Sequence, residues 1–372
     1  LGSFCSAIEL RPLTFNTTFK SIAYKFFDGH KKTLPQPKLS CRTGTDPSTR
    51  TARHLPMTSP LKIECSENRF VNPKYTAEGK PRAQVSLSGL RTLWFNTGTV
   101  CNLSCVNCFM ESSPTNNNLS FLKLYEVETF LNEIQHRNLP TREIGFTGGE
   151  PFINPDLISM LELCLEKNFR VLVLTNAMRP MMKTAPALQS LREKFGTRLV
   201  VRVSIDHHDK KKHEMKRGIG TWEATIDGLI WLSSQGFECR VAGRRSGSET
   251  EKQSRLGYTK LFASYDIRID ARDPEQLVLF PEMNSSQVAQ EISTTCFSTL
   301  NVEPKHLMCS HSRMVMRRKN ASRPTVVACT LITDDKQFEL GSNLAGCDKT
   351  IVLNHPFCAQ FCVLGGATCS NG

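Results

Sequence analysis

Short apolar runs alternate with stretches of helical periodicity between residues 90 and 283. Continuous Val, Ile and Leu runs are typical of parallel strands that are buried on both faces. The expected strands are residues 91–96, 143–147, 170–175, 198–206, 237–242 and 277–280. Strands that alternate with helices predict an α/β fold with a parallel sheet. Such units, if they close only partway, would form a partial TIM-like barrel.

Helices are expected between these strands, because apolar residues there recur three and four positions apart. Asn154 and Pro155 are favoured at the N-cap and first position, so one helix is expected to begin there. The apolar positions that define the clearest helices are Val127, Phe130, Leu131 and Ile134; Leu157, Leu161 and Leu165; and Trp222, Ile226, Leu229 and Ile230. The helical pattern thins over residues 284–372, which predicts a second, loop-rich domain.

Three cysteines follow the first expected strand: Cys101, Cys105 and Cys108, with the spacing C-x3-C-x2-C. Three thiolates this close can bind three irons of a [4Fe–4S] cluster, whereas ferredoxins supply Cys to all four irons. The open fourth iron indicates chemistry at the cluster itself. A zinc knuckle and free core thiols are the alternatives, but structural zinc needs four ligands, and no nearby Cys or His completes the set.

Polar or glycine residues stand where later strands end. In barrels of this type the active site lies at the C-terminal ends of the strands, so these residues are expected to meet there. Glycine allows a backbone to approach a ligand closely, and a carboxylate can pair with an ammonium group. The candidates are Gly148, Gly149, Glu150, Asn176, Ser204 and Gly243.

The cysteine trio and Gly148-Gly149-Glu150 together resemble the radical S-adenosylmethionine (SAM) superfamily over about residues 90–283. The resemblance implies a (βα)6 partial-barrel core and a SAM molecule whose amino and carboxylate groups chelate the open iron. It implies that the Gly-Gly-Glu loop contacts the amino group and that Ser204 contacts the ribose or carboxylate. Weaker matches imply cofactor contacts at Asn176 and Arg217, and the resemblance places Gly243 where the fifth strand lies near adenine.

The implied activity is cleavage of SAM, by the reduced cluster, to methionine and a 5′-deoxyadenosyl radical that abstracts hydrogen from a peptide or small molecule. An external low-potential donor of the flavodoxin or ferredoxin type would supply the electron. Asn107 departs from the family, because many members have an aromatic residue there that packs on adenine. The alternative is a non-catalytic Fe–S or zinc module for redox or structural use, which would have no use for the Gly-Gly-Glu loop.

A second group of cysteines occupies residues 284–372 and predicts a cysteine-rich domain. In position it resembles the SPASM or twitch extensions of some radical SAM enzymes, and the tail is similar to bacterial radical SAM proteins called Fe–S oxidoreductases. A possible second [4Fe–4S] cluster is expected there, with zinc or free thiols as alternatives. Its best ligands are Cys309, Cys329, Cys358 and Cys362, any one of which Cys296 or Cys369 could replace.

Composition limits the function classes. The net charge is +12, but half of this excess lies in residues 1–60, which hold nine Lys or Arg and three Asp or Glu. The positive charge on the remaining residues is therefore too dilute to indicate a nucleic-acid surface. No apolar run approaches the roughly 20 residues of a membrane span. The 15 cysteines cluster, which indicates metal thiolates in a reducing compartment.

The N-terminal 60 residues are rich in Ser, Thr, Pro and basic residues. Organellar transit peptides and disordered tails both have this composition, and both interpretations stay open. Residues 61–89 would connect this extension to the barrel core at 90–283. The expected location is the cytoplasm, or the interior of a plastid or mitochondrion if residues 1–60 are a transit peptide.

Overall fold

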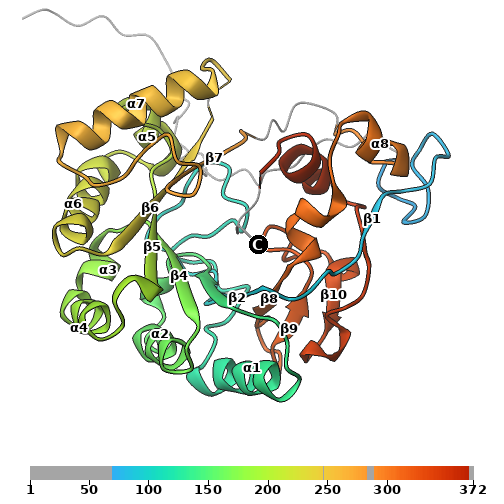
Figure 1. Cartoon of the computed structure of the whole chain (residues 1–372), viewed down its shortest axis with the longest axis horizontal. Helices are drawn as coiled ribbons and strands as arrows, with labels where there is room; N and C mark the ends of the chain where they lie inside the picture. Colours follow the sequence, from blue (N-terminus) through green and yellow to red (C-terminus); the bar gives the residue numbers. More distant parts are fainter. Residues whose placement is uncertain (1–68, 246, 283–288, 368–372) are drawn as a thin grey trace, which may run out of the picture. The chain divides into compact units, whose positions relative to one another are not determined.

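The computed structural model describes residues 69–245, 247–282 and 289–367, and these are arranged around a nine-stranded sheet (Figure 1). Six parallel strands follow one another in chain order, and all six were predicted, with small shifts at their ends. They are β2 (Thr92–Asn96), β3 (Glu143–Thr147), β4 (Arg170–Thr175), β5 (Leu199–Ser204), β6 (Glu238–Arg244) and β7 (Leu277–Phe280). The predicted α/β partial barrel is confirmed.

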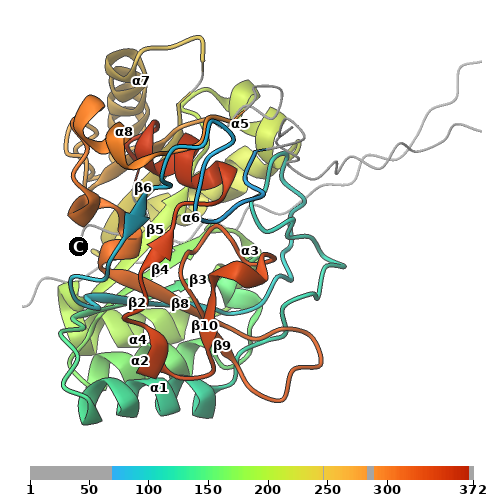
Figure 2. The same ribbon diagram turned by 90° about the vertical axis from the view of Figure 1, so that its right-hand side faces the viewer.

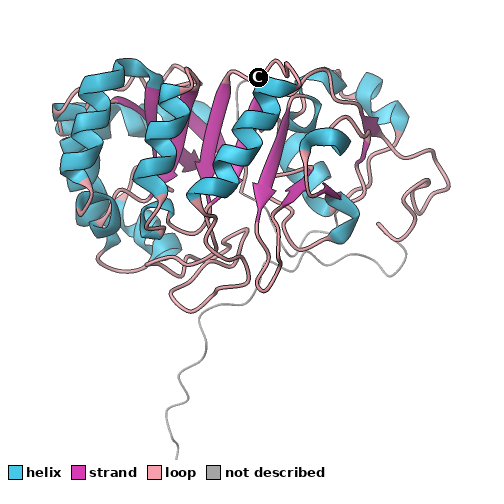
Figure 3. Cartoon of the chain, turned by 90° about the horizontal axis from the view of Figure 1, so that it is seen from below, coloured by secondary structure: helices cyan, strands magenta, loops and turns pink. Residues whose placement is uncertain are grey.

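Helices cover the outer side of this sheet (Figures 1 and 3). The three predicted helices correspond to α1, α2 and α6. The helices in this layer are α1 (Leu124–His136), α2 (Leu157–Glu166), α3 (Arg179–Met182), α4 (Ala185–Phe195), α5 (Lys210–Arg217), α6 (Thr221–Ser234) and α7 (Glu251–Ser264). Short 3-10 turns lie at Pro151–Ile153, Gly196–Arg198, Pro304–His306, Met308–Ser310, Lys336–Phe338 and Leu344–Gly346.

The expected helix start at Asn154 is wrong. Helix α2 begins at Leu157, and Asp156 occupies its N-cap position. The buried Asn154 amide instead donates to the carbonyls of Thr97 at 3.1 Å and Leu122 at 2.9 Å. Asn154 therefore joins the turn after β3 to the segments that flank the cysteine loop.

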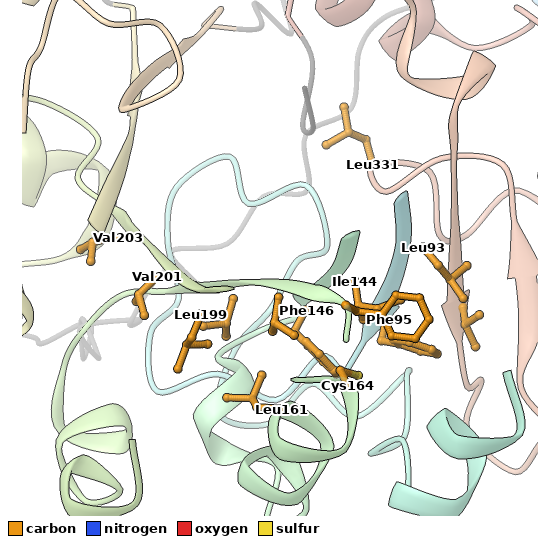
Figure 4. Packing of buried hydrophobic residues seen from close by; sticks show 14 of the residues in the cluster. Leu93, Phe95, Ile144, Phe146, Leu161, Cys164, Leu199, Val201, Val203 and Leu331 are labelled. Carbon is orange, nitrogen blue, oxygen red and sulfur yellow. The ribbon is translucent and has the colours of Figure 1, made fainter. Parts of the chain in front are cut away.

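The two faces of the sheet are both apolar, as the continuous hydrophobic runs predicted. The outer face contributes residues such as Phe95 and Phe146, which pack with Leu161 and Cys164 of α2 (Figure 4). The inner face carries a separate apolar layer that includes Trp94. A Cβ atom at Gly145 would lie 2.3 Å from the Trp94 ring, so β3 needs glycine at this position. Trp94 thus helps to fill the barrel below the strand ends.

The C-terminal segment continues the same sheet (Figure 2). Strand β8 (Ser312–Met316) pairs in parallel with β2, and the antiparallel strands β9 (Thr325–Val327) and β10 (Glu339–Gly341) follow. The remaining elements are α8 (Thr294–Thr299), a π-helix at Cys358–Val363, and the pair β1 (Gln84–Val85) and β11 (Ile351–Val352). Between residues 289 and 367, the expected cysteine-rich region is therefore joined to the barrel core by strand pairing.

Some expectations concern segments beyond the described ranges. The 1–60 extension, residues 61–68 of the 61–89 connection and Cys369 lie outside the described residues. Within the described part of the chain, no helix combines the length and the apolar character that crossing a membrane requires.

Candidate active site

A cavity of about 180 Å³ lies at the C-terminal ends of the parallel strands, where the sequence predicted the active site. Residues from β2, β3, β4, β5, β6 and β7 or the loops after them contribute to its wall. The predicted site residues that line it are Cys101, Cys105, Cys108, Gly148, Gly149, Asn176, Ser204, Arg217 and Gly243. The fold thus gathers residues that span more than a third of the chain.

The cysteine loop after β2 rests on the Gly148-Gly149 turn after β3. The amide of Gly149 donates to the Gly98 carbonyl at 2.8 Å, and that of Glu150 donates to the Val100 carbonyl at 3.1 Å. A Cβ atom at position 149 would lie 2.3 Å from the Val100 oxygen. At position 148 the backbone has a φ of 145°, which favours glycine. Both glycines are therefore required by the backbone of the cysteine loop.

The three cysteines of this loop suit an iron cluster. Burial raises the pKa of Cys101 to about 12, and burial also raises the pKa of Cys105. Thiols in such surroundings become ligands when a bound cation compensates the thiolate charge. The described residues that line the cavity include no fourth cysteine and no histidine. This donor set fits a [4Fe–4S] cluster with three protein ligands.

Glu150 differs from the other predicted site residues, because it is buried behind the cavity wall. Its carboxylate accepts hydrogen bonds from the Thr175 hydroxyl at 2.8 Å and from the amides of Asn176 at 2.8 Å and Phe152 at 3.2 Å. Burial raises its pKa to about 7, although these hydrogen bonds oppose the shift. In this structure the carboxylate therefore orients the loop after β4. A direct contact with a SAM amino group stays a prediction.

Asn176 connects that loop to the cysteine loop. Its side-chain amide donates to the Asn102 side-chain oxygen at 2.9 Å, and its carbonyl accepts from the Thr225 hydroxyl of α6 at 3.1 Å. The neighbouring Asn102 directly follows Cys101. Asn176 is thus held at the cavity wall from two sides.

A buried ion cluster forms another part of the wall. Asp206 lies 3.2 Å from the Arg217 guanidinium and 3.4 Å from that of Arg244. Burial alone would raise the pKa of Asp206, but the two arginines outweigh it and hold the pKa at about 2. Arg244 also donates to the carbonyls of Val106 at 3.5 Å and Asn107 at 3.4 Å. The Asp206–Arg244 pair at the ends of β5 and β6 thus supports the cysteine loop that follows β2.

Asp206 and Arg244 were not among the predicted cofactor contacts, although both line the cavity. The signal that could have selected them is their position at the ends of β5 and β6. One oxygen of Asp206 is buried and has no hydrogen-bond partner among the described residues. It is thus available as an acceptor to whatever occupies the cavity.

Glycine is required at position 243 because of the packing behind the cavity wall. A Cβ atom there would lie 2.2 Å from the Tyr258 hydroxyl, which donates to the Ile205 carbonyl at 2.6 Å. Asn107, the position where the sequence departs from the family pattern, adopts a φ of 58°, a left-handed conformation that Asn tolerates. Its side chain is not part of the cavity lining.

The second group of cysteines also converges. Cys309, Cys329, Cys358 and Cys362 line one small cavity together with apolar residues such as Leu331. Burial raises the pKa of Cys309 to about 11 and that of Cys358 further, and this is the environment of thiols rather than of exposed thiolates. The four sulfurs come from three separate chain segments. Cys296 and Cys347 are not part of this lining.

The two cysteine groups are joined by aromatic packing. Phe109, next to Cys108, makes edge-to-face contacts with Phe357 at 5.7 Å and Phe361 at 5.9 Å between ring centroids. Phe357 and Phe361 flank Cys358 in the sequence. The C-terminal segment therefore packs directly on the loop of the first site.

His207, His208 and Glu249 form a third polar group, with ligand atoms within 4.8 Å of one another. The His207 Nδ1 atom accepts from the Asp209 amide at 2.9 Å, so a neutral ring carries its proton on Nε2. That proton points to Glu249, whose carboxylate also contacts Lys212 at 2.6 Å. These contacts favour a hydrogen-bonded link between loops over a metal site.

The chain is similar to known proteins over the part that includes this cavity. A family model described as the radical SAM superfamily matches residues 95–244. The chain is 29% identical over 143 residues to the subtilosin biosynthesis protein AlbA of Bacillus subtilis, and 28% identical over 142 residues to the AdoMet-dependent heme synthase of Methanosarcina barkeri. Each match covers 38% of this chain, but only 30% of the first relative and 38% of the second.

The fold is similar to that of Streptococcus suis SuiB bound to S-adenosylmethionine. That structure matches with a TM-score of 0.50 at 14% sequence identity, over 68% of this chain and 63% of SuiB. This likeness supports the partial-barrel fold.

Proposed function

We propose that the chain is a radical SAM enzyme with a [4Fe–4S] cluster on Cys101, Cys105 and Cys108, and the match of residues 95–244 to the radical SAM family supports this. When bound and reduced, this cluster supplies the electron that splits SAM into methionine and a 5′-deoxyadenosyl radical, which takes hydrogen from an organic substrate. The observation that carries the proposal is the single cavity at which the three cysteines meet residues from five further strands.

The chain's own residues would hold SAM in place. The Gly148-Gly149 turn would support its amino end, and Ser204 and Asn176 would offer hydrogen bonds to its polar groups. Arg217 would offer a positive charge to its carboxylate, with Asp206 fixing the guanidinium. The apolar lining that includes Leu174 and Phe280 would limit the access of water to a reactive species.

The partners of the reaction are a substrate and an electron donor. The names of the two relatives above describe different pathways, so they support no single substrate class for this chain. The electron would come from an external low-potential donor of the flavodoxin or ferredoxin type, because no described group other than a bound cluster could supply it.

The competing function is a metal or redox module without catalysis. Anaerobic reconstitution with iron and sulfide, reduction with dithionite and chromatography for 5′-deoxyadenosine distinguish the two. We expect the nucleoside from the wild-type chain and none from the Cys101→Ala/Cys105→Ala/Cys108→Ala variant. The Cys164→Ala variant is the matched control, because this cysteine is buried between α2 and the sheet. A fully reconstituted wild-type chain that leaves SAM intact would support the module.

We also propose an auxiliary [4Fe–4S] cluster on Cys309, Cys329, Cys358 and Cys362. Their shared apolar cavity supports a complete four-thiolate set. Two such clusters correspond to about eight irons per chain, and one corresponds to about four. Iron near four with one zinc would favour a structural zinc site, and iron near four without zinc would leave these cysteines as free thiols.

A further inference from the structure

Arg313 is a buried cation without a carboxylate partner. It lies on β8, is only 1% exposed and is one of the largest fully buried side chains. Among the described residues, no Asp or Glu oxygen lies within 4.0 Å of its guanidinium. Other buried arginines do have such a partner: Arg82 pairs with Glu291 and Arg217 with Asp206.

Backbone carbonyls hold the Arg313 guanidinium in place. Nε donates to the Cys347 carbonyl at 2.8 Å, and Nη1 donates to the carbonyls of Cys309 at 2.6 Å and Ser312 at 2.7 Å. Nη2 donates to the Lys349 carbonyl at 3.3 Å. These contacts satisfy four of its five N–H donors and fix its position, but they leave its full positive charge uncompensated.

The groups that act electrostatically on Arg313 are mainly cysteines of the second group. Burial lowers its pKa, and negative charge on Cys309, Cys347 and Cys329 would oppose that shift. Asp348 acts in the same sense but is exposed to solvent. An unpaired buried charge costs several kcal/mol, so such a site is expected to acquire a counter-charge.

We propose that Arg313 is the counter-charge of the auxiliary cluster and that it raises the reduction potential of that cluster. The inference rests on the auxiliary cluster proposed above. A [4Fe–4S] core with four thiolates carries a net charge of about −2 when oxidised and about −3 after it accepts one electron from the external donor. A fixed cation close to the ligands stabilises the more negative state more strongly, because Coulomb energy grows with charge.

The position of Arg313 favours this role over a purely structural one. A side chain needed only to satisfy four carbonyls could be replaced by turns or polar groups without charge. Arg313 instead donates to the carbonyl of Cys309, which is itself one of the expected ligands. The guanidinium is therefore anchored to the backbone of the cysteine that it would compensate.

An EPR-monitored redox titration of the full chain tests the proposal. The Cys101→Ala/Cys105→Ala/Cys108→Ala background removes the first cluster, so that only the auxiliary signal is followed. We expect Arg313→Gln to lower the ratio of reduced to oxidised cluster at a fixed potential at least tenfold, which is 59 mV for a one-electron couple. Arg313→Lys keeps the charge and should stay near the wild-type ratio, although it loses the hydrogen-bond fork.

The matched control is Arg318→Gln, which removes a charge from the same segment where Arg318 pairs with Glu339 near the surface. It should leave the titration unchanged. If Arg313→Gln does not fold, the Arg313→Lys variant provides the test. A wild-type ratio of reduced to oxidised cluster together with lower stability in this variant supports the proposal. A cluster of unchanged potential in Arg313→Gln, or Lys and Gln variants that shift alike, would overturn it. A chain with no auxiliary iron at all would overturn the auxiliary cluster and this inference together.

Discussion

The Gly148-Gly149 turn illustrates how single residues determine this site. Glycine at these positions is required by the carbonyls of Gly98 and Val100, which lie where a Cβ atom would be. The steric demand therefore comes from the cysteine loop, and a ligand is not needed to explain it. Substitution at this turn tests whether the loop conformation controls cluster binding.

We expect Gly149→Ala to displace the cysteine loop, because its Cβ atom would lie 2.3 Å from the Val100 oxygen and 2.7 Å from that of Thr99. Iron at the first site should fall after reconstitution, and SAM affinity should weaken at least tenfold, or about 1.4 kcal/mol. Iron analysis and calorimetry measure the two effects. Gly247→Ala is the control, since no atom lies within 4 Å of its Cβ position. Wild-type iron content and affinity in Gly149→Ala would contradict the prediction.

Glu150 provides a pH-dependent test. Burial raises its pKa to about 7, above the unfolded value of about 4.3, so the native state holds the proton more tightly. Its contribution to stability is therefore fully present below about pH 4.3 and is lost as the pH rises through 7. Urea unfolding of the cluster-free chain should show the wild type losing about 4 kcal/mol relative to Glu150→Gln across this window. A difference that does not change with pH would refute the shift.

Helix α5 shows how an element is attached to the site. Arg217 in its last turn reaches Asp206 after β5, and the Lys216 carbonyl accepts from the Val106 amide of the cysteine loop at 2.7 Å. Asp209 caps its first turn by accepting from the Lys212 amide at 3.0 Å. The helix is short and mostly charged, so these contacts and the packing of buried His213 on Trp222 hold it in place.

We therefore expect Asp206→Asn to destabilise the chain by about 3 kcal/mol, because it leaves two partly buried arginines without their buried carboxylate. The iron content of the first site should fall as well, since Arg217 and Arg244 both adjoin the cysteine loop. Thermal unfolding and iron analysis check this. The exposed pair of Lys210 and Glu223 on neighbouring helices is the comparison. Glu223→Gln should leave both measurements unchanged, and equal effects of the two variants would show that the buried cluster has no special role.

At the scale of the whole described unit, the two cysteine groups are carried by segments that flank strands of the same sheet. Strand β8 pairs with β2, which leads into the first cysteine loop, while the Arg313 side chain of β8 contacts the second group. Phe109 adds a direct contact between the first loop and the C-terminal segment. A change of conformation on metal binding at one site can thus alter the packing around the other site.

Removing the second metal site should nevertheless leave the first one chemically competent, because its three ligands lie on a different loop. For the Cys358→Ser/Cys362→Ser variant we expect iron to fall from about eight to about four per chain. The melting temperature should fall too, since metal binding is coupled to the folding of loop-rich segments. SAM cleavage by this variant should persist. Loss of all iron would show that the two sites assemble as one.

The strands, the fold class and the cysteine trio of this protein could all be predicted from local patterns in the sequence. Buried parallel strands need continuous apolar runs, and cluster ligands need fixed local spacing, so both patterns are visible along the chain. The same holds for the Gly-Gly-Glu turn, whose residues are contiguous. Patterns of this kind can be recognised without knowing which residues are neighbours in the folded chain.

The surroundings of each polar residue could be found only from the folded structure. Glu150 lies behind the wall and not in it, because Thr175 and the Asn176 amide take up its carboxylate. Asp206 and Arg244 are brought to the cavity by parallel pairing of β5 with β6. The tail cysteines and Arg313 are attached to the barrel because β8 pairs with β2, a contact between segments more than 200 residues apart. No local pattern encodes such a pairing, because burial and charge balance are properties of neighbours that only folding brings together.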